Sequence, residues 1–143
     1  MGGLDYRASP DWAAKLGISA DGLVEFQLRS IEFLRDVARP FQGQIPEILI
    51  AGIVGPRGDA YREGHTITAE EAKEYHGVQI ETLREADVDL VSAMTFNSVP
   101  EGVGVARAAA KAGLPFSLSF IVDPAGHRAV AEGCGGGGGR AGR

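Results

Sequence analysis

Polar residues that could bind a small molecule stand directly after two apolar runs of the chain. Gly55, Pro56 and Arg57 follow the first run, and Thr95 and Asn97 end the second. An arginine guanidinium can bind a carboxylate through two parallel hydrogen bonds, and threonine and asparagine side chains can bind other polar groups. We therefore predict substrate binding by these five residues. The structural alternative is that the first three form a turn and that Asn97 belongs to a helix cap.

Histidine and cysteine give weaker indications of chemistry. His76 is in line with Ala72, Ile80 and Leu83 on a predicted helix, which favours a packing residue over a general base. Cys134 is the only cysteine, and it lies in a glycine tract without a base that would lower its thiol pKa. A lone cysteine excludes an internal disulfide and a cysteine-pair metal site, so we predict no metal site in this chain. The cysteine content fits a reducing compartment, and we expect a cytoplasmic protein.

The apolar runs that precede the candidate residues predict strands. They cover residues 47–56, 89–96 and 115–122. With the helices before and between them, the order is α, β, α, β, α, β, which predicts an α/β fold with a parallel sheet and right-handed crossover helices. Ligands bind beyond the carboxyl ends of the strands in such sheets, and the candidate residues lie there.

Start and stop signals mark four main helices. Ser9 and Pro10 begin a short one that ends near Gly17, and Ser19 caps a second that Pro40 ends. A capping box, Thr68 to Glu71, opens a third helix to about residue 86. The fourth runs from residue 97 to residue 113. The stripe expected to be buried on the second helix is Val24, Leu28, Ile31, Leu34 and Ala38.

Composition limits the classes of function. The chain has 143 residues, 44% of them hydrophobic, which suffices for one globular domain. A net charge of −5 argues against nucleic acid or an anionic membrane as a partner. Eight of the last twenty residues are glycine. We therefore divide the chain into a domain at 1–123 and a flexible Gly-rich tail at 124–143.

Several motifs occur together in the order and spacing of one enzyme family. They are Arg-Ala-Ser-x-x-Trp-x-x-x-Leu-Gly at 7–17, Gly-Pro-Arg-Gly-Asp at 55–59, Thr-Ala-Glu-Glu-Ala at 68–72, Tyr-His at 75–76 and Asp-Leu-Val-Ser-Ala-Met-Thr at 89–95. Over about residues 4–123 the chain resembles the homocysteine S-methyltransferase family. The resemblance implies a (β/α)₈ barrel that moves a methyl group from a sulfonium, betaine or folate donor to the thiol of homocysteine. The partners it implies are thus a small thiol and a methyl donor.

The chain departs from the family in two ways. In full-length members the resemblance implies a zinc ion that holds the thiol as thiolate, bound by three cysteines that have no counterpart here. Many members also carry Phe-Glu-Thr where this chain has Ala93-Met94-Thr95, and the family glutamate helps to bind the ammonium group of homocysteine. Met94 cannot accept that hydrogen bond. The acceptor is therefore either another thiol or homocysteine bound differently.

The length predicts only part of the barrel. Eight strand–helix units need about 250 residues, so the three strands here match the third to fifth of the family, and the family's second strand would end at about Tyr6. We expect a truncated member that is inactive alone. The alternative is a non-catalytic α/β module that self-associates or pairs with a missing barrel part. A third reading, a flavodoxin-like domain that binds an anion at residues 55–59, lacks the expected fingerprint.

Overall fold

The computed structural model describes residues 1–58 and 67–122. All three strands are parallel and lie in the order β1-β2-β3. The predicted α/β class and the helical crossovers are therefore confirmed. The elements are α1 (Pro10–Lys15), α2 (Ala20–Ala38), the 3-10 turn η1 (Arg39–Phe41), β1 (Ala51–Val54), α3 (Ala69–Glu85), β2 (Leu90–Phe96), α4 (Val99–Ala112) and β3 (Phe116–Phe120). No helix in these two ranges is long and apolar enough to cross a membrane.

Local hydrogen bonds explain where the helices begin and end. The Ser19 hydroxyl accepts the Gly22 amide at 3.1 Å at the start of α2. Thr68 and Glu71 form the predicted capping box at the start of α3. Gly113 ends α4 in the left-handed conformation, with φ 72°, which glycine adopts without a steric penalty. These boundaries agree with the sequence prediction.

Two predictions about extent were wrong in part. The first strand covers four residues instead of ten, because the Ile50 amide is bound by the Asp89 carboxylate and residues 47–50 pair with no strand. On α2 the predicted stripe is confirmed at Ile31, Leu34 and Ala38, which are buried, but not at Val24 and Leu28. Leu28 is 38% exposed, whereas Leu23 and Gln27 are buried, because Gln27 turns inward to donate to the Ala8 carbonyl at 3.2 Å.

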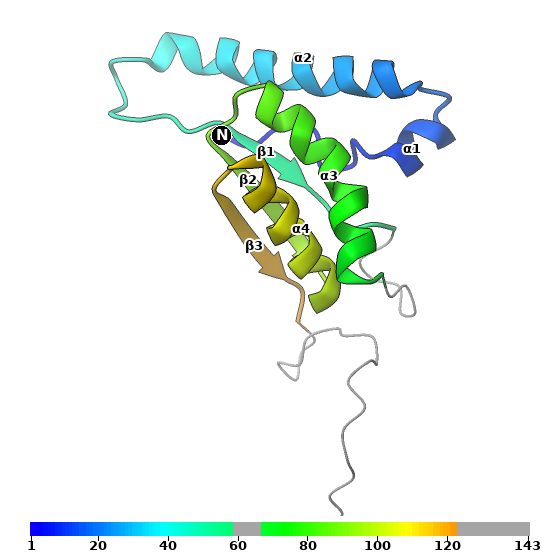
Figure 1. Ribbon diagram of the computed structural model, residues 1–143. Coiled ribbons are helices and arrows are strands. Elements are labelled where there is room, and N and C mark those ends of the chain that lie inside the picture. Colours follow the sequence, from blue (N-terminus) through cyan, green and yellow to red (C-terminus); the bar gives the residue numbers. More distant parts are fainter. Residues whose placement is uncertain (59–66, 123–143) are drawn as a thin grey trace, which may run out of the picture.

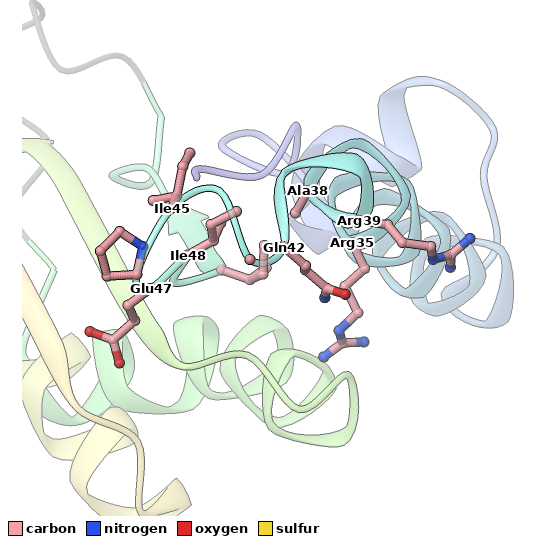
Figure 2. Close-up of a pocket in the computed structure, with 10 residues that line it drawn as sticks. Arg35, Ala38, Arg39, Gln42, Ile45, Glu47 and Ile48 are labelled. Atoms are coloured by element: carbon pink, nitrogen blue, oxygen red, sulfur yellow. The ribbon is translucent and has the colours of Figure 1, made fainter.

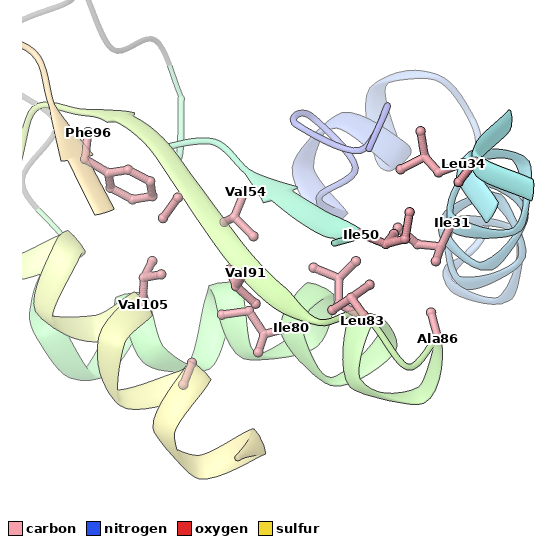
Figure 3. Close-up of a cluster of buried hydrophobic side chains, with 14 residues drawn as sticks. Ile31, Leu34, Ile50, Val54, Ile80, Leu83, Ala86, Val91, Phe96 and Val105 are labelled. Atoms are coloured by element: carbon pink, nitrogen blue, oxygen red, sulfur yellow. The ribbon is translucent and has the colours of Figure 1, made fainter. Parts of the chain in front are cut away.

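Helices α3 and α4 cover one face of the sheet, and α2 lies across the C-terminal end of α3 (Figure 1). Between these layers lies the main apolar core (Figure 3). Its fully buried members include Ile31, Val54, Leu83, Val91 and Phe96. Alternate residues of β2 and β3, such as Met94, Ser117 and Ser119, point to the opposite face and are exposed.

The N-terminal segment lies along the other edge of β1. The Gly3 amide donates to the Ala51 carbonyl at 2.9 Å, and the Ala51 amide donates to the Met1 carbonyl at 2.7 Å. Gly2 and Ala51 form a parallel bridge. This segment thus occupies the position at which the resemblance places the family's second strand.

A pocket of about 440 Å³ opens at the amino end of β1 (Figure 2). It lies between the end of α2 and the segment before the strand, with Arg35, Arg39, Gln42, Glu47 and Ile50 among its lining residues. The candidate substrate residues follow β1 at its carboxyl end. This pocket therefore contains none of them.

Candidate functional site

Gly55 lies where β1 ends and contacts Tyr6 closely. Its amide donates to the Tyr6 carbonyl at 3.1 Å. A Cβ at residue 55 would lie 2.7 Å from that carbonyl oxygen and 2.8 Å from two ring carbons of Tyr6. Only glycine fits here without displacing the Tyr6 backbone. Pro56 follows and, like Gly55, is buried in the turn after β1.

Thr95 stands at the end of β2 in an unusual backbone conformation. Its φ is 63°, which is rare for a β-branched residue. Three hydrogen bonds hold it: its amide donates to the Ser119 hydroxyl at 3.0 Å, its hydroxyl donates to the Met94 carbonyl at 2.6 Å, and the Tyr6 hydroxyl lies 2.5 Å from its own. Residues other than glycine with a positive φ are often found at functional sites. Tyr6 thereby connects the ends of β1 and β2.

Arg57 is held at both its backbone and its side chain. Its amide donates to Glu101 Oε1 at 2.6 Å, and its Nε donates to Asp11 Oδ2 at 3.1 Å. The guanidinium carbon lies 4.7 Å from the centre of the Tyr75 ring, within the range of a cation–π contact. The side chain is 46% exposed. Arg57 therefore offers a fixed cation to a ligand at the strand ends.

A buried pair, His76 and Glu101, lies beneath this turn. His76 Nε2 is 2.8 Å from Glu101 Oε1, and the two side chains are 1% and 2% exposed. The His76 ring lies 4.9 Å from the Tyr75 ring and 5.6 Å from the Phe96 ring, measured between centroids. The expectation that His76 packs inside the fold is confirmed, but its hydrogen-bonding partner Glu101 was not foreseen.

Tyr75 and Asp5 are the residues near this face with altered acidity. Burial raises the pKa of the Tyr75 phenol, and a hydrogen bond with Ser9 opposes that rise. Burial also raises the pKa of Asp5 to about 6, against the hydrogen bond it accepts from the Ile53 amide. The other Asp5 oxygen, Oδ1, is buried without a hydrogen-bond partner in the described ranges. Burial therefore disfavours the charged form of both groups, although Asp5, with a pKa of about 6, is mostly ionised at neutral pH.

A second group of cations packs on aromatic rings beside the site. Arg7 and Lys15 both lie over the Trp12 ring, with their charged groups 5.4 Å and 4.2 Å from its centre. Arg7 also donates to the Gly58 carbonyl. Trp12 thus serves as a partly buried anchor for the segment that carries Tyr6 and Asp11.

The structure brings together part of the predicted set. Gly55 and Thr95 both contact Tyr6, and Arg57 stands at the turn that follows Gly55. Asn97 directly precedes Ser98, whose hydroxyl accepts the Glu101 amide at 3.4 Å as the cap of α4. Tyr6, Tyr75 and Glu101 were not among the predicted site residues. Their sequence separations from their partners, up to 89 residues, leave no local signal.

The described residues do not provide a metal site. No three His, Cys, Asp or Glu side chains within 1–58 and 67–122 are placed to hold an ion. The zinc ligands that the resemblance implies have no equivalent in these ranges. Cys134, His65, His127, Asp59 and the Gly-rich tail predicted at 124–143 lie outside the described residues.

Three parallel strands joined by helices, with polar residues at their carboxyl ends, form an α/β arrangement of the kind found in TIM barrels. The structure is similar to the homocysteine methyltransferase MmuM from Escherichia coli. Against the metallated form the TM-score is 0.79 at 22% identity, over 90% of this chain and 48% of that chain. The oxidised form gives the same TM-score over 47% of its chain, and the apo form gives 0.67 over 43%.

The family follows from the sequence. The family model described as Homocysteine S-methyltransferase matches residues 5–134, which is most of the chain. The chain therefore belongs to the homocysteine S-methyltransferase family, as its motifs predict. It spans about half the length of the MmuM structures. No curated protein sequence matches it.

Proposed function

We propose that this chain forms part of a thiol methyltransferase and orients the thiol acceptor at the carboxyl ends of β1 and β2. The proposal is based on the contacts of Arg57. Its Nε is engaged by Asp11 and its face by Tyr75, while its two terminal NH₂ groups have no hydrogen-bond partner in the described ranges. We propose that these groups form parallel hydrogen bonds to the carboxylate of an amino-acid acceptor such as homocysteine.

The reaction class is methyl transfer to sulfur. A bond forms between the acceptor sulfur and the methyl carbon while the donor's bond to that carbon breaks, and the thiol hydrogen leaves as a proton. The part we assign to this chain is orientation, because holding the acceptor by its carboxylate limits the positions of its sulfur. Thr95, fixed by Tyr6, and the exposed Met94 lie at the neighbouring strand end.

Calorimetry with two ligands tests the role of Arg57. We expect Arg57→Gln to weaken binding of L-homocysteine by about tenfold or more, since a hydrogen bond to a charged group is worth about 1.5–3 kcal/mol. Binding of 3-aminopropane-1-thiol, which lacks the carboxylate, should not change. Arg29→Gln, at an exposed arginine paired with Glu25 on α2, is the matched control. Equal losses for both ligands would refute carboxylate binding by Arg57.

A second candidate function is a non-catalytic module that self-associates or pairs with another barrel part. Within the described ranges the sheet ends at β3, and Phe116 on this edge strand is 43% exposed. The outward face of α2 also exposes Phe26 and Phe33. Exposed apolar groups beside an open strand edge favour association with another polypeptide. Light scattering at several protein concentrations tests this candidate.

A further inference from the structure

We propose that His76 and Glu101 are positioning residues, which together hold the Arg57 backbone so that its guanidinium faces the acceptor. The inference rests on the carboxylate-binding role proposed for Arg57. Glu101 Oε1 is the shared acceptor, 2.6 Å from the Arg57 nitrogen and 2.8 Å from His76 Nε2. One carboxylate oxygen therefore connects the turn after β1 to both α3 and α4.

We infer that His76 Nε2 carries the hydrogen of the pair and donates it to Glu101 Oε1, because a carboxylate oxygen has lone pairs for both the imidazole and the Arg57 amide. With that hydrogen in place, Oε1 accepts from the imidazole and from the Arg57 amide at once. Hydrogen bonds to a charged acceptor are short and directional, which matches the 2.6 Å distance to the Arg57 nitrogen.

The burial of His76 and Glu101 indicates that the pair serves more to orient the Arg57 backbone than to stabilise the fold. The two side chains are 1% and 2% exposed, and removing their polar groups from water costs free energy that the hydrogen bond between them largely offsets. Apolar side chains of similar size would fill the same space. What they could not supply is an acceptor for the Arg57 amide, which would then lose its partner.

The same part of α3 also holds the Arg57 side chain. Tyr75, next to His76 in the chain, carries the guanidinium on its ring, and the two rings of residues 75 and 76 meet edge to face. Backbone and side chain of Arg57 are thus fixed from one helix segment. His76 further contacts Phe96, the last residue of β2, so the pair connects the ends of both strands that carry candidate residues.

The Arg57 amide gives a ligand-free readout of the pair. We expect its proton resonance to move in Glu101→Gln and in His76→Gln, because the carboxylate charge or the imidazole donor is replaced while a hydrogen-bonding group is kept. Thr82→Val is the control, at a buried residue of α3 whose hydroxyl donates only to the Val78 carbonyl at 3.2 Å. An Arg57 amide that stays in place in Glu101→Gln, or that moves equally in Thr82→Val, overturns the proposal.

Binding of L-homocysteine gives the second readout, measured on the same 143-residue chain. We expect Glu101→Ala to weaken binding about tenfold and Glu101→Gln, which still accepts the Arg57 amide, to keep it within about threefold. Wild-type affinity in a folded Glu101→Ala variant would overturn the proposal. If that variant does not fold, loss of binding in Glu101→Gln overturns it instead. A wild-type chain that binds no homocysteine refutes the proposed function alone, because the amide readout needs no ligand.

Discussion

At the scale of single residues, the Asp5 carboxylate takes the place of a backbone hydrogen-bond acceptor beside β1. Its carboxylate accepts the Ile53 amide at 3.2 Å, and the Gln79 amide donates to the carbonyls of Asp5 and Ile53 at 2.7 Å and 3.0 Å. Side chains thus satisfy backbone groups where the N-terminal segment leaves the sheet. This allows the next residue, Tyr6, to turn toward Thr95.

Asp5 should make stability depend on pH. Its pKa of about 6 lies above the ordinary value of 3.8, so its contribution is fully present below about pH 3.8 and is lost as the pH rises through 6. We expect Asp5→Asn to be more stable than the wild type at pH 7.5, by up to about 3 kcal/mol, and to equal it near pH 3.5. Urea unfolding across this range measures the difference. Asp36→Asn, at an exposed ion pair, is the control, and a pH-independent difference would contradict the prediction.

The Met94 position should decide affinity for the ammonium group of homocysteine. Met94 is 42% exposed at the end of β2 and offers no acceptor for a charged donor. In a full-length relative with methionine here, we expect substitution by glutamate to tighten homocysteine binding about ten- to a hundredfold. Calorimetry measures it. No gain would mean that this residue lies outside the ammonium subsite.

At the scale of elements, the close contact of α3 with α4 depends on one glycine. A Cβ on Gly104 would lie 2.4 Å from the Ala72 Cβ and 2.6 Å from the Ala69 carbonyl oxygen. The two helices therefore approach to backbone contact. His76 and Glu101 can meet because the helices that carry them pack this closely.

Alanine at two helical glycines should have opposite effects. Gly104→Ala should destabilise the fold by about 1–3 kcal/mol, because backbone atoms of α3 would have to move. Gly77→Ala, on α3 with open space around its Cβ direction, should stabilise it by about 0.5–1 kcal/mol. Thermal unfolding of the two variants measures the contrast. Equal effects would show that the Gly104 contact does not limit helix packing.

Elements were predictable from the sequence, whereas the contacts of the site were not. Capping residues such as Ser19, Thr68 and Gly113 act within four residues, so their patterns are visible in the chain. The Arg57 amide and Glu101 are 44 residues apart, and nothing near either one indicates the other. The direction of the buried Gln27 side chain on α2 likewise depends on a distant carbonyl.

At the scale of the whole molecule, the sheet has one covered edge and, among residues 1–58 and 67–122, one open edge. The N-terminal segment pairs with β1, while the described part of the chain ends the sheet at β3. In a closed eight-stranded barrel every strand has two neighbours. This chain covers 48% of the MmuM chain, so its described strands can form only part of such a ring by themselves.

The open edge should cause the 143-residue chain to self-associate. We expect its mean mass by light scattering to rise with concentration, because β3 has no further strand beside it in the described ranges and Phe116 is exposed. Phe116→Lys should shift the chain toward monomer, since a lysine on an edge strand opposes pairing with a second strand. Phe33→Lys, on the outward face of α2, distinguishes the two surfaces: association that falls only in this variant would assign the contact to the helix. A monomer at every concentration, with a sharp cooperative melt, would instead mean that these described elements form a self-contained fold.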